Sequence, residues 1–214
     1  MLFLLAACGG SGEKSPTVNN TASAGVEAPE TPKRSGYRST APVGPGERDR
    51  IPEPPQEFAV RVLKAVKSGD VKALASLLAP DGVLLSPDLH VDEEDVRLKP
   101  EEFLKAWEEN RTFVWGHEAG SGRPIEMGIR EFFKRYLYGR DYLSAPEIAT
   151  NRRLGRGNVK DNVKDVYPDA VFVEFHFPGT EKNGGMDWSS LRVVLRKYGE
   201  DWKVVALLHD GWSP

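Results

Sequence analysis

The stretch Tyr167–Trp212 decides the fold, and it reads YPDAVFVEFHFPGTEKNGGMDWSSLRVVLRKYGEDWKVVALLHDGW. Three runs in it alternate with period two between an apolar face and a second face, which is the pattern of half-buried strands. Turn-like segments rich in glycine, at residues 178–185 and 198–201, separate the runs. The sequence therefore predicts an antiparallel meander of three strands.

The alternation also predicts which side chains share a face. The apolar face is expected to carry Val171, Val173, Phe175, Phe177, Leu191, Val193, Leu195, Trp202, Val204, Ala206 and Leu208. The other face is expected to be wet, with cross-strand charge pairs among Glu174, His176, Arg192, Arg196 and Lys203. Continued past Leu208, the pattern places Asp210 and Trp212 on the apolar face and His209 on the wet face. A single bulge in this strand would exchange the two faces.

Helical segments in the first half of the chain are expected to cover the apolar face. Residues 56–68 and 71–78 have apolar side chains at helical spacing, with Gly69 and Asp70 as C-terminal glycine and N-cap between them. The remaining expected elements are a strand at 82–87, an acidic loop at 88–96, a helix from Pro100, a strand at 112–115, a glycine-rich loop at 116–124, a helix at 129–137, an edge strand at 145–152 and a mobile loop at 154–162.

Composition limits the possible classes of protein. The 214 residues have 39% hydrophobic residues, a mean hydropathy of -0.46 and a net charge of -3. These values suit one domain with a segment outside the core, and the absence of a basic stripe excludes nucleic-acid binding. Cys8 is the single cysteine, so neither a disulfide framework nor a cysteine zinc cluster can form within one chain.

The first residues predict the localisation of the protein. The apolar run that begins at Met1 is too short to span a bilayer, and its end, Leu5-Ala6-Ala7-Cys8, resembles the bacterial lipobox. This resemblance implies a lipid-modified Cys8 and a lipid-anchored, extracytoplasmic protein of the bacterial cell envelope. No Lys or Arg precedes the apolar run, so the true start codon could lie upstream of Met1. The competing interpretation of Cys8 is a buried free cysteine after an apolar start without signal function.

Three segments follow from these observations. Residues 1–8 are the remnant of a lipoprotein signal, residues 9–55 are a flexible linker rich in Pro, Gly and Ser, and residues 56–214 are the folded domain. The linker has too few apolar residues to offset the entropy of ordering it, so a disordered tether is expected.

Several segments of the sequence resemble those of a known superfamily. Residues 67–74, followed by Leu78-Ala79-Pro80-Asp81-Gly82-Val83, resemble the opening of nuclear transport factor 2-like domains, also called cystatin-like α+β cones, and residues 201–212 resemble their last strand. Residues 112–116, 120–125, 142–148, 173–179 and 185–192 are similar to a group of uncharacterised bacterial lipoproteins. The resemblance implies an α+β fold in which N-terminal helices pack on the concave face of a curved antiparallel sheet. It implies no catalytic residues.

Candidate site residues come from the end of the last predicted strand and from two tryptophan-containing segments. A carboxylate such as Asp210 at the end of an apolar wall would have a raised pKa and could act as general acid or base, as carboxylates do in the cone-shaped isomerases that the fold resembles. The simpler interpretation is that Asp210 caps a turn at the solvent rim while Trp212 closes the core. The expected ligand-binding residues are Trp115, Asp187, Trp188, Asp210 and Trp212. For Trp188, packing at the start of a strand is the competing interpretation.

No cofactor or metal is expected. The four histidines form no pair with the spacing of a metal site, and the acidic run at 92–95 lacks the spacing of a calcium loop. One open alternative is a zinc site made by His176 and His209 if they share the outer face. The absence of a G-x-S-x-G motif excludes the usual serine hydrolase elbow. We therefore expect a non-enzymatic domain that binds a small apolar ligand or an envelope protein. The alternative is a pocket enzyme of the isomerase or hydrolase type that uses Asp210.

Overall fold

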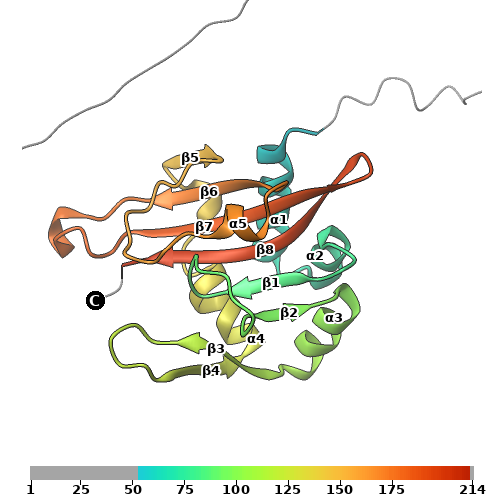
Figure 1. Ribbon diagram of the computed structural model, residues 1–214, viewed down its shortest axis with the longest axis horizontal. Helices are drawn as coiled ribbons and strands as arrows, with labels where there is room; N and C mark the ends of the chain where they lie inside the picture. The colour runs from blue at the N-terminus through green and yellow to red at the C-terminus, as the bar shows by residue number, and fades with distance from the viewer. Residues whose placement is uncertain (1–52, 213–214) are drawn as a thin grey trace, which may run out of the picture. The chain divides into compact units, whose positions relative to one another are not determined.

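The centre of the fold is the predicted three-stranded meander. In the computed structural model, which describes residues 53–212, β6 (Val171–Phe177), β7 (Ser189–Tyr198) and β8 (Asp201–Gly211) pair in antiparallel fashion. They belong to a six-stranded sheet with the order β2-β1-β8-β7-β6-β5 (Figure 1). The meander is therefore confirmed.

The outer strands extend this sheet on both sides. β5 (Glu147–Thr150) lies antiparallel on β6 at one edge, and β2 (Val96–Leu98) lies antiparallel on β1 (Val83–Ser86) at the other. β1 runs parallel to β8, and the other four pairings in this sheet are antiparallel, so the sheet is mainly antiparallel as predicted. A separate hairpin, β3 (Thr112–His117) with β4 (Pro124–Gly128), lies beside the sheet, and the sequence had not predicted β2 or β4.

The two N-terminal helices form for the predicted reasons. α1 (Pro55–Ser68) ends at Gly69, whose φ of 68° lies in the left-handed region that glycine tolerates. The Asp70 side chain accepts a hydrogen bond from the backbone N–H of Ala73 and caps α2 (Val71–Leu77).

Shorter helices complete the domain. They are α3 (Pro100–Glu109), α4 (Ile129–Phe132), which continues as the π-helix η1 (Phe133–Leu137), the 3-10 turns η2 (Tyr142–Ser144) and η3 (Glu181–Asn183), and α5 (Val163–Val166). None of the helices within residues 53–212 has the length and apolar character needed to cross a bilayer.

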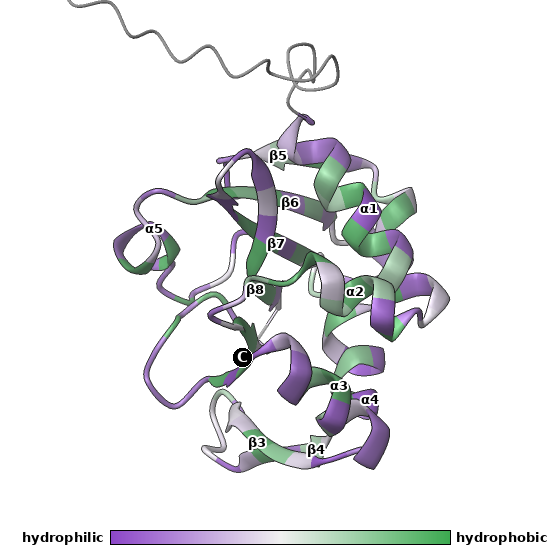
Figure 2. Cartoon of the chain, turned by 90° about the vertical axis from the view of Figure 1, so that its right-hand side faces the viewer, coloured by the Kyte–Doolittle hydropathy of each residue, from purple (hydrophilic) through white to green (hydrophobic). Residues whose placement is uncertain are grey.

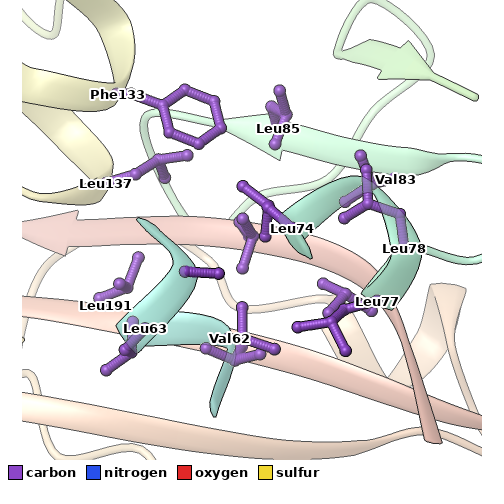
Figure 3. Packing of buried hydrophobic residues seen from close by; sticks show 14 of the residues in the cluster. Val62, Leu63, Leu74, Leu77, Leu78, Val83, Leu85, Phe133, Leu137 and Leu191 are labelled. Atoms are coloured by element: carbon purple, nitrogen blue, oxygen red, sulfur yellow. The ribbon is translucent and has the colours of Figure 1, made fainter. Parts of the chain in front are cut away.

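The helices cover the concave face of the curved sheet. Val173, Val193 and Val204 have no solvent exposure and share one core cluster with Phe58 and Leu74. Figure 3 shows labelled side chains of α1, α2, β1 and η1 gathered over the sheet together with Leu191 of β7. Each buried Val or Leu contributes about 1.5–3 kcal/mol relative to an exposed one. The predicted α+β class is confirmed, and the space between helices and sheet is called the cone below.

The opposite face of the sheet is not wet. A second core cluster, which includes Tyr167, Phe172, Val194 and Leu208, lies beneath α5 and the segments next to it. Figure 2 shows α5 on the side of β6–β8 that faces away from α1 and α2. Of the side chains predicted to be solvated here, Glu174, His176 and Arg192 are buried, whereas Arg196 and Lys203 are only partly buried.

A β-bulge decides which way the end of β8 faces. Val194 pairs with Ala206 while Leu195 pairs with Val204, so Val205 is an extra residue without a partner in β7. Because side chains alternate, one extra residue exchanges the faces for every position beyond it. The prediction that Asp210 lies on the helix side and His209 on the outer side is therefore wrong, and the two are exchanged.

The described chain starts next to the sheet. The indole Nε1 of Trp202 donates a hydrogen bond to the carbonyl of Glu53 at 2.8 Å, and Arg61 pairs with the Glu53 carboxylate at 2.6 Å. Pro55, expected to be the last residue of the tether, is the first residue of α1. The predicted lipid-modified Cys8 and residues 9–52 of the predicted tether lie outside the described residues.

Candidate functional site

A pocket of about 360 Å³ opens at the end of β8. Five parts of the chain meet here: the residues after β1, the β3–β4 hairpin, η1, the segment before α5 and the C-terminal end of β8. The lining residues are Pro87, Asp88, His117, Glu118, Ala119, Ile125, Arg135, Tyr136, Val159, His209, Asp210, Gly211 and Trp212. A volume of this size is in the range of small-molecule sites.

Two aromatic side chains shape the pocket. Tyr136 is half-buried, and its ring meets the imidazole of His209 edge-on, with centroids 5.5 Å apart. Burial raises the pKa of the Tyr136 phenol, so it stays protonated at neutral pH. Trp212 is 49% exposed at the outer side. These rings offer apolar area with polar groups at their edges.

His209 is held in one tautomer by its neighbours. Its Nδ1–H donates to the carbonyl of Pro87 at 3.1 Å, so Nε2 accepts from the Ser189 hydroxyl at 3.3 Å. The Tyr142 hydroxyl in turn donates to Ser189 Oγ at 2.5 Å. Burial lowers the pKa of His209 to about 4. A β-carbon at Gly211 would lie 2.8 Å from the imidazole Cε1, so this ring position requires glycine. The imidazole is neutral and already satisfied within the protein.

Asp210 lies on the opposite side of β8 from His209. Its carboxylate is 1% exposed, and Oδ2 accepts from Nε and Nη2 of Arg153 at 3.1 and 2.8 Å. Within residues 53–212, Oδ1 has no hydrogen-bond partner. Burial raises the pKa of Asp210 to about 6, although the Arg153 charge opposes this shift. The side chain is therefore neither in the cone nor at a solvent rim, which corrects both sequence interpretations.

Residues 151–162, called the strap below, are fixed to the outer face by a buried ionic cluster. Glu174 Oε1 accepts from the backbone N–H groups of Leu154 and Gly155 at 2.8 and 3.0 Å. Arg192 donates to Glu174 at 2.7 Å and to Asp161 at 2.6 Å. The loop predicted to be mobile is thus held at both of its ends and at Arg153.

A serine–histidine pair lies in the same cluster. His176 Nδ1 and Ser190 Oγ are 2.8 Å apart, and burial lowers the pKa of His176. Such a pair resembles a nucleophile and its base, but Ser190 is fully buried and also donates to Glu174. No substrate carbonyl can approach this hydroxyl, so the pair is structural.

The β-bulge in β8 separates the two histidines of the alternative zinc site. His176 lies on the outer face and His209 on the helix side, so the sheet separates the two imidazoles. Within residues 53–212, no cluster of three or more His, Cys, Asp or Glu side chains is arranged to hold a metal ion.

Three predicted ligand-binding residues have other positions. Trp115 is 1% exposed, stacks on Phe132 and donates from Nε1 to the Met127 carbonyl at 2.9 Å, so it belongs to the core. Asp187 accepts hydrogen bonds from Thr180 and Asn183 in the β6–β7 connection, and these bonds lower its pKa to about 2.

Trp188 packs beside His176 and against Gly155 and Gly157 of the strap. Of the five predicted residues, Asp210 and Trp212 line the pocket. Tyr136 and His209 were not predicted as pocket residues, because Tyr136 fits an ordinary helical apolar pattern and the position of His209 depends on the bulge.

The cone itself is filled by side chains. Its buried side chains form one core cluster that joins the helices to the sheet. A cavity of about 10 Å³ lies among α1, α2, α3 and η1 and is bounded by Leu74, Phe103, Trp107 and Phe133, among others. Phe133 meets Trp107 edge-on at 5.0 Å and Phe103 at 5.7 Å. A space of this size holds at most one water molecule.

Comparison with known proteins concerns the fold. No protein-family model matches the chain, and no curated protein matches it. A DUF4783 family protein from Bacteroides ovatus is 14% identical, with 72% of this chain and 94% of that chain covered and a TM-score of 0.33. A nuclear transport factor 2-like protein of unknown function from Pseudomonas putida is 11% identical, with 72% and 82% covered and a TM-score of 0.35.

A nuclear transport factor 2-like protein with a cystatin-like fold from Novosphingobium aromaticivorans is also 11% identical, with 72% and 76% covered and a TM-score of 0.33. Likeness at this level carries no argument about activity.

Proposed function

We propose that this domain is a non-enzymatic module of the nuclear transport factor 2-like kind, which binds a small, largely apolar ligand in the pocket at the end of β8. The observation that carries the proposal is the packing of the cone, where side chains of the helices and of the sheet belong to one buried core cluster. The pocket at the end of β8, at about 360 Å³, has the space that the cone lacks. Tyr136, Ile125 and Trp212 supply its apolar surface.

The state of the titratable groups supports binding rather than catalysis. A general base needs a free lone pair within reach of substrate. Both nitrogens of His209 are engaged inside the protein, and Asp210 is paired with Arg153. His209 therefore has no free lone pair, and Oδ1 of Asp210, which accepts no hydrogen bond within residues 53–212, is buried out of reach of a substrate.

A direct binding experiment tests the proposal. Native mass spectrometry of the purified domain, followed by extraction, would identify a co-purifying small molecule. Tyr136→Ala together with Trp212→Ala should abolish its retention, whereas Met186→Ala, which removes an exposed apolar side chain outside the pocket, should not. Retention that is equal in all three proteins would contradict a ligand at the end of β8.

A second candidate function rests on the raised pKa of Asp210, which is about 6. A carboxyl with such a pKa suits general acid–base chemistry of the isomerase or hydrolase type near neutral pH. For this candidate, Asp210→Asn should abolish turnover of a substrate while the melting temperature stays nearly unchanged. A large loss of stability in this variant would instead assign Asp210 a structural role.

The lipid anchor and the cell envelope location belong to the same proposal. They rest on Leu5-Ala6-Ala7-Cys8 and on the linker composition of residues 9–55. Several acyl chains on Cys8 would hold the protein durably, since each buried methylene contributes about 0.8 kcal/mol. Intact-mass analysis of membrane-extracted protein tests this, with Cys8→Ser as the control that should lose the added mass and leave the membrane fraction.

A further inference from the structure

The solvent side of the strap carries a row of cations. Arg152, Arg156 and Lys160 are exposed, and within residues 53–212 none of the three makes a hydrogen bond or an ion pair. Asp161 is the one carboxylate in the sequence of the strap, and it is paired with Arg192 at 2.6 Å. The positive charges of this row are therefore not neutralised within the strap.

The residues between the cations fix the direction in which the row points. Every second residue of the strap faces the sheet or the pocket: Arg153, Gly155, Gly157, Val159 and Asp161. Successive side chains of an extended chain point to opposite sides. The three cations occupy the positions of the other parity, so they project together into solvent from a backbone that the buried ionic cluster holds in place.

The sequence does not show this row as a basic stripe. Residues 152–160 read RRLGRGNVK, with the cations dispersed among small and apolar residues. The structure separates Arg153, which is neutralised by Asp210, from the three cations that face solvent. Nearby, α5 adds the exposed Lys164 and Asp165, and Asp169 is exposed in the turn that follows. Positive charge therefore remains in excess on this face.

The composition of the row favours a broad anionic surface over a compact ligand. Its members are Arg152, Leu154, Arg156, Asn158 and Lys160, and none is aromatic. Aromatic side chains are the platforms on which proteins stack single-stranded nucleic acids, and they are common anchors of protein interfaces. A bilayer of anionic lipids attracts basic residues through its surface potential, without aromatic anchors or a defined geometry.

We infer that the row of cations on the strap is a docking surface for a bilayer that contains anionic lipids. The row lies outside the pocket lining, to which the strap contributes Val159, so the inference goes beyond the proposed ligand. The proposed acyl chains on Cys8 would keep the domain close to a bilayer. The row would then turn the strap toward the lipid and α1 and α2, on the opposite side of the sheet, away from it (Figure 2).

Vesicle sedimentation tests the inference with the full chain carrying Cys8→Ser. This protein cannot be acylated on Cys8, so the result does not depend on the proposed anchor. Vesicles of phosphatidylcholine alone are compared with vesicles that also contain phosphatidylglycerol. We expect binding to the anionic vesicles alone. Binding should disappear when the salt concentration rises from about 0.1 to 1 M, because the screening length falls from about 10 to 3 Å.

Neutralising the row should remove this binding. In Arg152→Gln/Arg156→Gln/Lys160→Gln the affinity for anionic vesicles should fall about 100-fold, which corresponds to about 3 kcal/mol. The melting temperature should stay unchanged, because all three side chains are exposed. Arg152→Lys/Arg156→Lys keeps the charges and should keep the binding. Loss of binding in this charge-keeping variant would overturn the inference, since a lipid surface recognises the charge and not the guanidinium.

A matched control separates the row from the net charge of the protein. Lys64→Gln/Lys72→Gln/Lys134→Gln removes the same number of charges from exposed positions of α1, α2 and η1, on the other side of the sheet. This variant should keep most of the affinity for anionic vesicles. Equal losses in the two neutralised variants would overturn the inference, because the attraction would then come from the overall charge.

Other probes identify a different partner. A decaglutamate peptide and a single-stranded DNA oligonucleotide are titrated against the same Cys8→Ser protein. Binding of either probe without binding of the vesicles would overturn the lipid surface and assign the row to an acidic protein or to a nucleic acid. Equal binding to both kinds of vesicle would also overturn it. Neither result bears on the pocket, whose ligand is tested by co-purification.

Discussion

The guanidinium Nη2 of Arg153 lies 2.8 Å from Oδ2 of Asp210, in an ion pair that joins the strap to β8 across 57 positions of sequence. Arg153 also donates to the carbonyl of Val159 at 3.0 Å. Val159 and Asp210 both line the pocket, so this one side chain couples the position of the strap to the shape of the pocket.

Removing Arg153 should leave a buried carboxylate without its partner. Arg153→Ala is expected to lower the free energy of unfolding by on the order of 3 kcal/mol, because an uncompensated buried charge is costly. Urea denaturation measures the change, and Arg152→Ala, at the exposed neighbouring position, should change it little. Equal losses in both variants would contradict a special role for the ion pair.

Asp210→Asn should be less harmful than Arg153→Ala. The amide is neutral and can still accept from Arg153, which is 23% exposed and reaches water. We expect a loss of about 1–2 kcal/mol, typical of a weakened hydrogen bond to a charged group. The double variant should recover part of the loss seen in Arg153→Ala, because no buried charge then remains. A double-mutant cycle with no coupling would argue against the pair.

Glu174→Gln should loosen the strap. The amide oxygen can accept from Leu154 and Gly155, but the amide nitrogen then faces the Arg192 guanidinium, which is also a donor. We expect trypsin to cut the variant faster within residues 152–160, where the wild-type backbone is held against the sheet. Cleavage rates are followed by mass spectrometry, with Glu181→Gln on the exposed β6–β7 connection as the control. Unchanged cleavage in Glu174→Gln would show that other contacts hold the strap.

A side chain at Gly155 should collide with Trp188. A β-carbon at this position would lie 2.5 Å from Cζ3 of Trp188 and 2.8 Å from Oδ2 of Asp210. Gly155→Ala is expected to lower the free energy of unfolding by about 1–3 kcal/mol, the usual range for overpacking. Thermal unfolding measures it against Asn158→Ala in the exposed part of the strap, and a neutral Gly155→Ala would mean that the indole can move aside.

His209 should make stability depend on pH. Its folded pKa of about 4 lies below the usual histidine value of 6.5, so the unfolded state binds more protons between these two values. Stability from this group is therefore complete above about pH 6.5 and is lost as the pH falls toward 4, by about 3 kcal/mol. The stability difference between wild type and His209→Gln should shrink over this range. An imidazole NMR signal of His209 that titrates with a midpoint near 6.5 would contradict the buried neutral ring.

Asp210 should change the stability with pH in the opposite direction to His209. Its folded pKa of about 6 lies above the usual aspartate value of 3.8, so its contribution is present at low pH and is lost as the pH rises toward 6. The two neighbouring residues therefore oppose each other between about pH 4 and 6. Their single variants, and not the wild type, should reveal the pH dependence.

Much of the architecture follows from local patterns in the sequence. The period-two runs predict β6, β7 and β8, and the spacing of apolar residues with Gly69 and Asp70 predicts α1 and α2. These elements could be predicted because each carries apolar residues at a regular local spacing. The strand β2 and the helix α5 were not predicted, since three or four residues are too few to establish a period.

Only the tertiary structure decided which residues form the site. From Val204 to Leu208 every side chain is apolar, because this part of β8 is buried on both faces, and such a run carries no sign of the extra residue at Val205. That bulge sends His209 toward Tyr136 and Asp210 toward Arg153. The sequence by itself determined the strands and helices, since periodicity is local. The pairing of β8 with β7 decides on which face of the sheet each side chain at the end of β8 lies. The residues that line the pocket depend on that choice.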